Sequence, residues 1–124
     1  MTTLTADDLR ARLPPPLAWP ADCECSRLVC PGWESLASPP GEPLLKHLGS
    51  LRVGGDEEPT LAEHHADGSS YWSPRAPIAT AFFPYNRCEV WACRHCGRGF
   101  VQYTEFGGYY VDHRIREVDP ALLR

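Results

Sequence analysis

The sequence predicts an α+β fold, in which an antiparallel β-sheet meander carries short helices at the two ends of the chain. Turn signals such as Asp67-Gly68 separate several short runs of apolar and aromatic residues, which is typical of neighbouring strands. Residues 109–118 alternate between apolar and charged side chains, as a strand with one buried face does. The clearest helical signals stand at the ends of the chain, in residues 5–13 and 119–124.

Residues 1–22 are expected to form a short helix followed by a proline-rich strap. Thr5 is a suitable N-cap, and Asp7 and Asp8 place negative charge in the first turn, where it suits the helix dipole. The prolines that follow end the helix and hold residues 13–20 extended. We interpret these residues as a strap that packs on its own domain; the alternative is a ligand for a proline-binding domain.

The remaining elements are assigned from short apolar runs bounded by turn residues. The predicted strands cover residues 44–53, 77–83, 88–92, 99–104 and 109–118, with a further hairpin at 60–65 and 70–73. Residues 44–53 also fit a helical stripe, and the glycine within them favours the strand. One helical turn is expected at residues 33–36, and Asp119-Pro120 provides the cap and first position of a last turn.

Length and composition predict a single small domain, residues 1–124. With 13 prolines and 10 glycines the regular structure is diluted and the core is thin, so a cross-link would stabilise it. The chain has no apolar run of membrane-spanning length, and its N-terminus is polar and acidic, which predicts a soluble cytoplasmic protein. One lysine against eleven arginines suggests a G+C-rich, bacterial genome.

Cys93 and Cys96 form a Cys-x-x-Cys pair between two predicted strands, and Gly97 follows at once. Tetrahedral zinc bound by sulfur needs two such pairs, each presented by a tight turn. A glycine after the second ligand permits the left-handed backbone that turns amide N–H groups toward sulfur, and Phe100 is placed to cover the site. The stretch from Cys93 to Phe100 resembles the knuckle of zinc-ribbon and rubredoxin-like proteins, which implies a metal site without implying an activity.

The second ligand pair is assigned to Cys23 and Cys25, with Cys30 and Cys88 as alternates. Thiols in the cytoplasm are kept reduced, so clustered cysteines there are more often metal ligands than disulfides. The interpretation preferred for Cys88 is a small buried apolar residue. We therefore expect one zinc-stabilised domain, with a structural zinc ion held by two distant cysteine pairs.

The sequence offers little support for catalysis. His64 and His65 are adjacent, so in a strand they point in opposite directions and cannot chelate a catalytic metal together. No glycine-rich phosphate loop, nucleophile elbow or paired carboxylate motif is present. A thiol redox role for the Cys-x-x-Cys pair is disfavoured because Gly97 and a strand follow it, whereas redox motifs open a helix. The protein is predicted not to be an enzyme.

A role in protein–protein interaction fits the composition best. The net charge is −4, and aromatic side chains, which interfaces concentrate, are frequent in the second half of the chain. The candidates are Tyr71, Trp72, Phe82, Phe83, Tyr85, Tyr103, Phe106, Tyr109 and Tyr110. Small inhibitors, immunity proteins and adaptors share this character. The alternative is a nucleic-acid-binding accessory protein that uses Arg94 and Arg98 of the knuckle, which the acidic balance disfavours.

Overall fold

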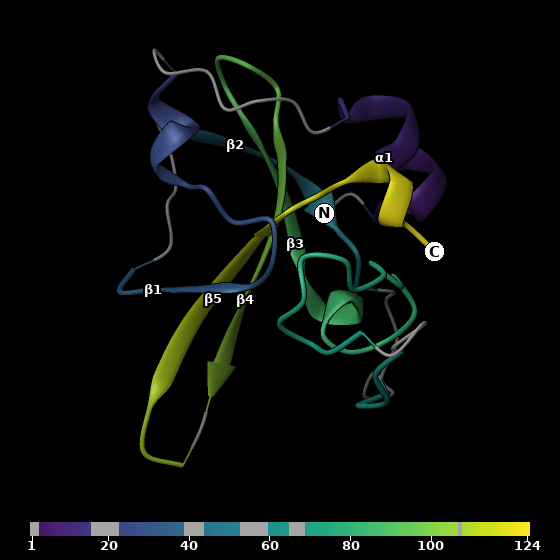
Figure 1. Ribbon diagram of the computed structural model, residues 1–124, viewed down its shortest axis with the longest axis vertical. Coiled ribbons are helices and arrows are strands. Elements are labelled where there is room, and N and C mark those ends of the chain that lie inside the picture. The colour runs from purple at the N-terminus through teal and green to yellow at the C-terminus, as the bar shows by residue number, and fades with distance from the viewer. Residues whose placement is uncertain (1–2, 16–22, 39–43, 53–59, 65–68, 107) are drawn as a thin grey trace.

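The computed structural model describes residues 3–15, 23–38, 44–52, 60–64, 69–106 and 108–124. They contain a five-stranded antiparallel sheet with the strand order β1-β5-β4-β3-β2 (Figure 1). The elements in chain order are helix α1 (Ala6–Arg12), the 3₁₀ helix Glu24–Arg27, strands β1 (Glu34–Leu36) and β2 (Leu45–Ser50), the 3₁₀ helix Tyr85–Arg87, strands β3 (Glu89–Cys93), β4 (Gly99–Phe106) and β5 (Val111–Glu117), and the 3₁₀ helix Pro120–Leu122. Strands β2 to β5 pair in chain order, whereas β1 joins the opposite edge beside β5.

The α+β class predicted from the sequence is wrong, because the described residues are mainly antiparallel sheet. Within them the only α-helix is the seven-residue α1, and the expected C-terminal helix is a three-residue 3₁₀ helix. The capping signals themselves are present: Thr5 and Asp8 form a capping box, and Asp119 accepts a hydrogen bond from the N–H of Ala121. Such signals start a helix, but in so short a segment few further backbone hydrogen bonds follow the first turn, so the helix does not grow.

Two further predicted elements differ from the structure. Residues 33–36 were expected to make a helical turn, but Glu34 lies opposite Ile115, so that the segment becomes the edge strand β1. Residues 77–83 were expected to form a strand. They form turns instead, apart from a single bridge between Ile78 and Leu123. In both cases a partner distant in sequence decides the local conformation.

The predicted hairpin is absent from its described part, since residues 60–64 and 69–73 contain no strand. Its turn, residues 65–68, lies outside the described residues, as does most of the predicted strap, residues 16–22. The strands predicted at the positions of β2, β3, β4 and β5 are present. No helix in the described ranges is long and apolar enough to cross a membrane.

Opposite faces of the sheet carry two separate hydrophobic clusters. Phe100 and Val101 are neighbours in β4 and point to opposite faces, because side chains alternate along a strand. The helix-side cluster contains Leu4, Leu9, Leu13, Trp33, Leu51, Ile78, Tyr85, Cys88, Val90, Val101, Tyr103, Val118 and Leu123. The cysteine-side cluster contains Cys25, Leu28, Cys30, Leu44, Leu45, Cys93, Phe100 and Ile115.

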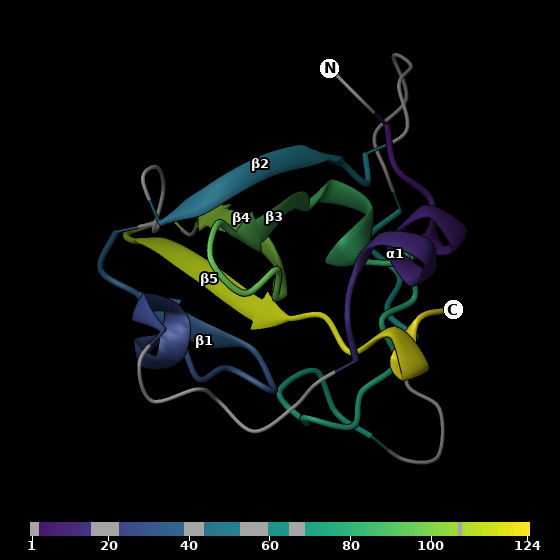
Figure 2. The same cartoon turned by 90° about the horizontal axis from the view of Figure 1, so that it is seen from above.

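Helix α1 lies beside the C-terminal end of the chain (Figure 2). There a guanidinium N–H of Arg10 donates to the carbonyl of Leu123 over 2.9 Å. Leu13, just after the helix, covers the start of β4 so closely that a Cβ on Gly99 would lie 2.4 Å from its Cδ1. This close packing fixes the helix on the sheet face opposite the cysteine-side cluster.

Candidate metal centre

Four cysteine sulfurs from two distant parts of the chain converge at one end of the sheet. The Sγ atoms of Cys23, Cys25, Cys93 and Cys96 all lie within 4.8 Å of one another. Three of the separations are 3.3 Å for Cys23–Cys25, 3.6 Å for Cys23–Cys93 and 3.3 Å for Cys25–Cys96. Four sulfurs around one zinc ion at the usual Zn–S distance of about 2.3 Å would be about 3.8 Å apart. The cluster is therefore close to the size that a tetrahedral metal ion requires.

The C-terminal pair is presented by the turn that joins β3 to β4. The N–H of Cys93 donates to the carbonyl of Arg98 over 2.8 Å, and the N–H of Gly97 donates to the carbonyl of Cys93 over 3.0 Å. Gly97 has a φ of 81°, in the left-handed region that glycine adopts without strain. With the backbone turned this way, the N–H of His95 lies 3.4 Å from the Cys93 sulfur and donates to it. The knuckle conformation expected from the sequence is present.

The N-terminal pair is held by the 3₁₀ helix Glu24–Arg27. Cys23 stands at the N-cap position, and its carbonyl accepts the N–H of Ser26 over 3.0 Å. The carbonyl of Cys25 accepts the N–H of Leu28 over 2.8 Å. These two hydrogen bonds fold the Cys-x-Cys segment tightly, so that both thiols point to one side despite the single intervening residue.

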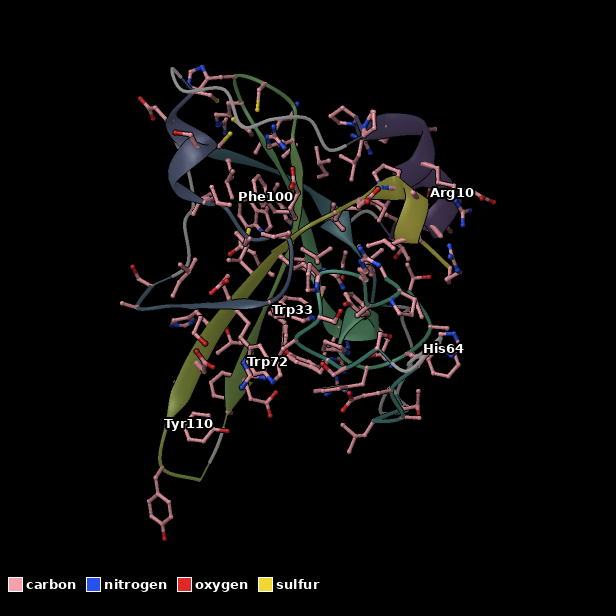
Figure 3. All side chains as sticks on the ribbon, viewed as in Figure 1. Arg10, Trp33, His64, Trp72, Phe100 and Tyr110 are labelled. Carbon is pink, nitrogen blue, oxygen red and sulfur yellow. The ribbon has the colours of Figure 1, made fainter. Side chains whose placement is uncertain are left out.

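Strand β2 and the core lock the two halves together. The N–H of Arg94 donates to the carbonyl of Leu44 over 3.1 Å, which ties the turn after β3 to the start of β2. Phe100 is fully buried and packs in the same cluster as Cys25 and Cys93 (Figure 3). The structure thus places the Phe100 ring next to the cysteines, as the sequence predicts. The thiols thus meet in surroundings where water is largely excluded on the sheet side.

Hydrogen bonding makes the thiols unequal. Burial alone would raise the pKa of Cys93, but the N–H groups of Cys96 and His95 and the neighbouring thiols lower it to about 7. Burial raises the pKa of Cys25, and its contacts with the other three sulfurs raise it further. Cys93 therefore ionises more easily than Cys25, and a bound cation would be needed to deprotonate all four sulfurs.

An internal ion pair lies next to the cluster. The guanidinium of Arg98 donates to the Glu117 carboxylate over 2.5 Å, and both side chains are buried. Burial lowers the pKa of Arg98, but Glu117 and then the thiols of Cys96 and Cys25 raise it above its ordinary value. Burial also raises the pKa of Glu117, which Arg98 opposes. The 2.5 Å contact between the guanidinium and the carboxylate supports the ionised form of both side chains.

Arg98 therefore places a fixed positive charge beside the thiols. Arg94 and His95, in the same turn, are exposed. The charge that faces the cluster from inside the protein is that of Arg98.

The two alternate cysteines lie elsewhere. The Cys30 thiol donates to the carbonyl of Leu28 over 2.9 Å, and burial raises its pKa to about 12. The Cys88 thiol is fully buried in the helix-side cluster and donates to the carbonyl of Pro84 over 3.3 Å. Both thiols thus use their protons in hydrogen bonds to backbone and stand apart from the group of four.

The side chains of His47, His64 and His113 have partners away from the site. His47 contacts Glu89 over 3.0 Å, and the ring of His64 stacks on Phe82. His113 accepts from or donates to Thr104 over 3.2 Å, according to its tautomer. Across the described ranges, the four cysteines are the one group of three or more cysteine, histidine or acidic side chains with converging ligand atoms.

Sequence reasoning missed the roles of two arginines in β5. Arg114 and Arg116 alternate with apolar residues, which suggested a solvent-facing row of charges. In the structure Arg116 is fully buried, and Arg114 donates hydrogen bonds to Tyr71 and Tyr103. No local signal marks these residues, because Tyr71, Ala76 and Tyr85, which they contact, are 31 to 43 residues away in sequence.

No family model matches this chain, and neither a curated protein nor a solved structure resembles it significantly. The geometry itself supports a site that can hold one metal ion with four sulfur ligands. Two ligands come from a 3₁₀ helix near the N-terminus and two from the turn between β3 and β4.

Proposed function

We propose that this is a small non-catalytic zinc protein, in which the four-cysteine centre is structural and the biological role is the binding of another protein. The convergence of four cysteine sulfurs within 4.8 Å carries the proposal. Four thiolates fill the tetrahedral shell of Zn²⁺, as in structural zinc sites, whereas catalytic zinc keeps an open position for water or substrate.

The surroundings of the cluster support a structural role. A thiol redox site would place its Cys-x-x-Cys pair at the start of a helix, but here the pair is followed by β4. Cys25 and Cys93 are buried in the cysteine-side cluster, where they join the N-terminal segment to the sheet. A bound ion would act as the cross-link that a thin core needs. Thiolates kept free for metal also suit the reducing cytoplasm.

A protein partner is favoured over nucleic acid because the most distinctive arginines are used internally. Arg98 pairs with Glu117, Arg114 pairs with Asp112, and Arg116 is fully buried. In contrast, several large apolar side chains are exposed, which is common at interaction sites. An inhibitor, immunity protein or adaptor would have this combination of a rigid small domain and an exposed apolar surface.

Metal analysis of the purified protein tests the structural-zinc part. Protein expressed without added metal should contain about one equivalent of zinc per chain by elemental mass spectrometry. Cys93→Ser should lose the metal, whereas the matched control Cys88→Ala should keep it, because Cys88 lies in the other cluster. Iron at one equivalent, with its visible absorption, would contradict the choice of zinc. Metal well below half an equivalent in the parent protein would contradict the site.

A further inference from the structure

The hairpin formed by β4 and β5 extends beyond the rest of the sheet. Pairing between β3 and β4 begins at Glu89 opposite Gln102. Pairing between β4 and β5 continues to Phe106 opposite Val111. The residues beyond the last β3 pair, 103–106 and 111–114, therefore form an arm, which β1 flanks only at His113 and Arg114. The arm projects from the body of the protein in Figure 1.

The end of the arm is apolar and exposed. Phe106 is 75% exposed, and Tyr109, Tyr110 and Val111 are each more than half exposed. Tyr110 lies near the far end of the hairpin in Figure 3. Exposing a group of large apolar side chains to water is unfavourable in free energy, and such patches usually mark an interaction site.

A hydrogen-bond network fixes the base of the arm. The guanidinium of Arg114 donates to Asp112 over 2.8 Å, to Tyr103 over 2.9 Å and to Tyr71 over 3.1 Å. Asp112 also accepts a hydrogen bond of 3.0 Å from the hydroxyl of Ser35 in β1. The arm is therefore attached to its neighbours on two sides. A rigid arm loses little conformational entropy when it binds, which favours affinity.

A hollow of about 250 Å³ lies beside this base. Its lining consists of Glu63, Tyr71, Trp72, Phe83, Glu105 and Arg114. The ring of Trp72 is 52% exposed and lies 5.0 Å from the Arg114 guanidinium. Because Asp112 balances Arg114, the carboxylate of Glu105 gives this side of the hollow a negative charge. Carboxylates and aromatic faces together attract an organic cation such as the side chain of arginine or lysine.

We propose that the arm is the docking element for a protein partner that has an apolar pocket with a basic rim. The pocket would receive Phe106, Tyr109 and Tyr110, and a rim arginine or lysine would enter the hollow between Trp72 and Glu105. This inference rests on the proposed role in protein binding and assigns that role to one surface.

The charges at the arm favour a protein over an anionic membrane or a nucleic acid. Arg114 is the arm's only arginine or lysine, and its Nε and Nη1 groups donate to acceptors within the protein. A phosphate-rich surface would instead meet Glu105 and Asp112. Nucleic acids and anionic membranes are normally held by several free basic side chains.

Site-specific photo-cross-linking in the native host tests the assignment. In the full chain, p-benzoylphenylalanine replaces Tyr110 at the arm or, as the matched control, Val29, which is 53% exposed and adjoins the cysteine-side cluster. We expect one protein to be cross-linked from position 110 and not from position 29. That protein is then purified, and its dissociation constant for the unmodified chain is measured by calorimetry.

Variants of the arm then test the chemistry of the contact. Phe106→Ser and Tyr109→Ser should each raise the dissociation constant at least tenfold, as is usual for central aromatic contacts. Glu105→Lys should raise it about tenfold at low salt and less at high salt, because the rim charge is screened. Val29→Ser should leave it unchanged. Phe106 and Tyr109 are exposed, so replacing their side chains should not disturb the fold.

The contrary results separate the two proposals. A partner cross-linked from position 29 alone would overturn the arm assignment and leave protein binding standing. No cross-linked protein from either position would overturn both. Phosphatidylcholine–phosphatidylserine vesicles and a 20-nucleotide single-stranded DNA serve as probes of the other classes. Binding of either one by the parent chain, lost in Tyr109→Ser, would overturn the choice of a protein partner.

Discussion

The guanidinium of Arg116 is wholly buried and donates an N–H to the hydroxyl of Tyr85. Its other N–H groups donate to the carbonyls of Pro31 over 3.1 Å, Pro74 over 3.2 Å and Ala76 over 2.9 Å. One side chain of β5 thus fastens two segments that have little regular structure of their own. Neutral oxygens satisfy its donors at these four contacts, which compensates for part of the cost of burying a charge.

Replacing Arg116 by methionine should destabilise the protein by about 3 kcal/mol or more. Methionine fills much of the space but removes the donor from the buried carbonyl of Ala76, from the Tyr85 hydroxyl and from two partly buried carbonyls, and an unsatisfied buried group carries a desolvation cost. Urea unfolding followed by circular dichroism measures the change. Arg12→Met, at an exposed position of α1, is the control and should stay within about 0.5 kcal/mol. Equal stability of the two variants would show that Arg116 has no anchoring role.

Removal of the metal should lower the thermal unfolding temperature by at least about 10 °C. A structural zinc site contributes on the order of 10 kcal/mol, and a loss of a few kcal/mol already shifts the midpoint of a domain this size by about 10 °C. A zinc chelator is added during a circular dichroism melt, and one equivalent of zinc should restore the original midpoint. If the midpoint is the same with and without chelator, the four cysteines do not stabilise the fold through a metal.

Phe100→Ala should destabilise the protein by about 3–5 kcal/mol, the usual cost of removing a buried phenylalanine side chain. Phe100 is fully buried beside Cys25 and Cys93, so the cavity would also loosen the thiols and weaken zinc binding in a competition assay. Phe106→Ala removes the same atoms from an exposed position in the same strand and should leave both stability and zinc affinity nearly unchanged. Similar losses in the two variants would contradict the burial described for Phe100.

The ion pair between Asp112 and Arg114 should make the stability of the protein depend on pH in the acid range. The hydrogen bond from Arg114 lowers the pKa of Asp112 below its ordinary 3.8; partial burial opposes it and the Ser35 hydroxyl adds to it. Because the folded-state pKa is depressed, the contribution is complete above the ordinary value and is lost as the pH falls through the lower folded value. Asp112→Asn should therefore cost about 1 kcal/mol at pH 7.

Between pH 4 and pH 2 the Asp112→Asn variant should lose less stability than the parent protein does. Urea unfolding at each pH measures both losses. If the unfolding free energy of the variant falls with pH as steeply as that of the parent protein, ionisation of Asp112 does not contribute to the acid sensitivity.

The parts of the site that could be predicted are those encoded within a single turn. The Cys93-x-x-Cys96 spacing and the glycine at 97 specify a knuckle locally, and the structure places the sulfurs and the left-handed residue accordingly. The other pair, Cys23 and Cys25, is less clearly encoded, because one residue separates these cysteines where a knuckle has two. A 3₁₀ helix supplies the extra curvature, and the sequence carries no distinct signal for it.

The parts that could not be predicted depend on distant partners. Ile78 lies in an apolar run that suggests a strand, yet it pairs only with Leu123 and is otherwise buried under turns. Arg116 stands at a position that alternation assigns to solvent, yet the segment containing Tyr85 covers it. Strand β5 is accordingly buried on both faces at its C-terminal end, whereas at the arm Val111 is exposed and the next three residues are partly buried. Local periodicity cannot show which faces the rest of the chain will cover.

The separation of the two cysteine pairs along the chain sets the order of events during synthesis. The sulfurs of Cys23 and Cys93 are neighbours in space but 70 residues apart in sequence. At about 5–20 residues per second, a ribosome makes the first pair several seconds before the second. If the proposed zinc ion binds here, the first pair has to stay reduced until the second is made, because two thiolates fill only half of its coordination shell. Metal loading would then be completed only after β3 and β4 have emerged, and a newly made chain would be most open to thiol oxidation in that interval.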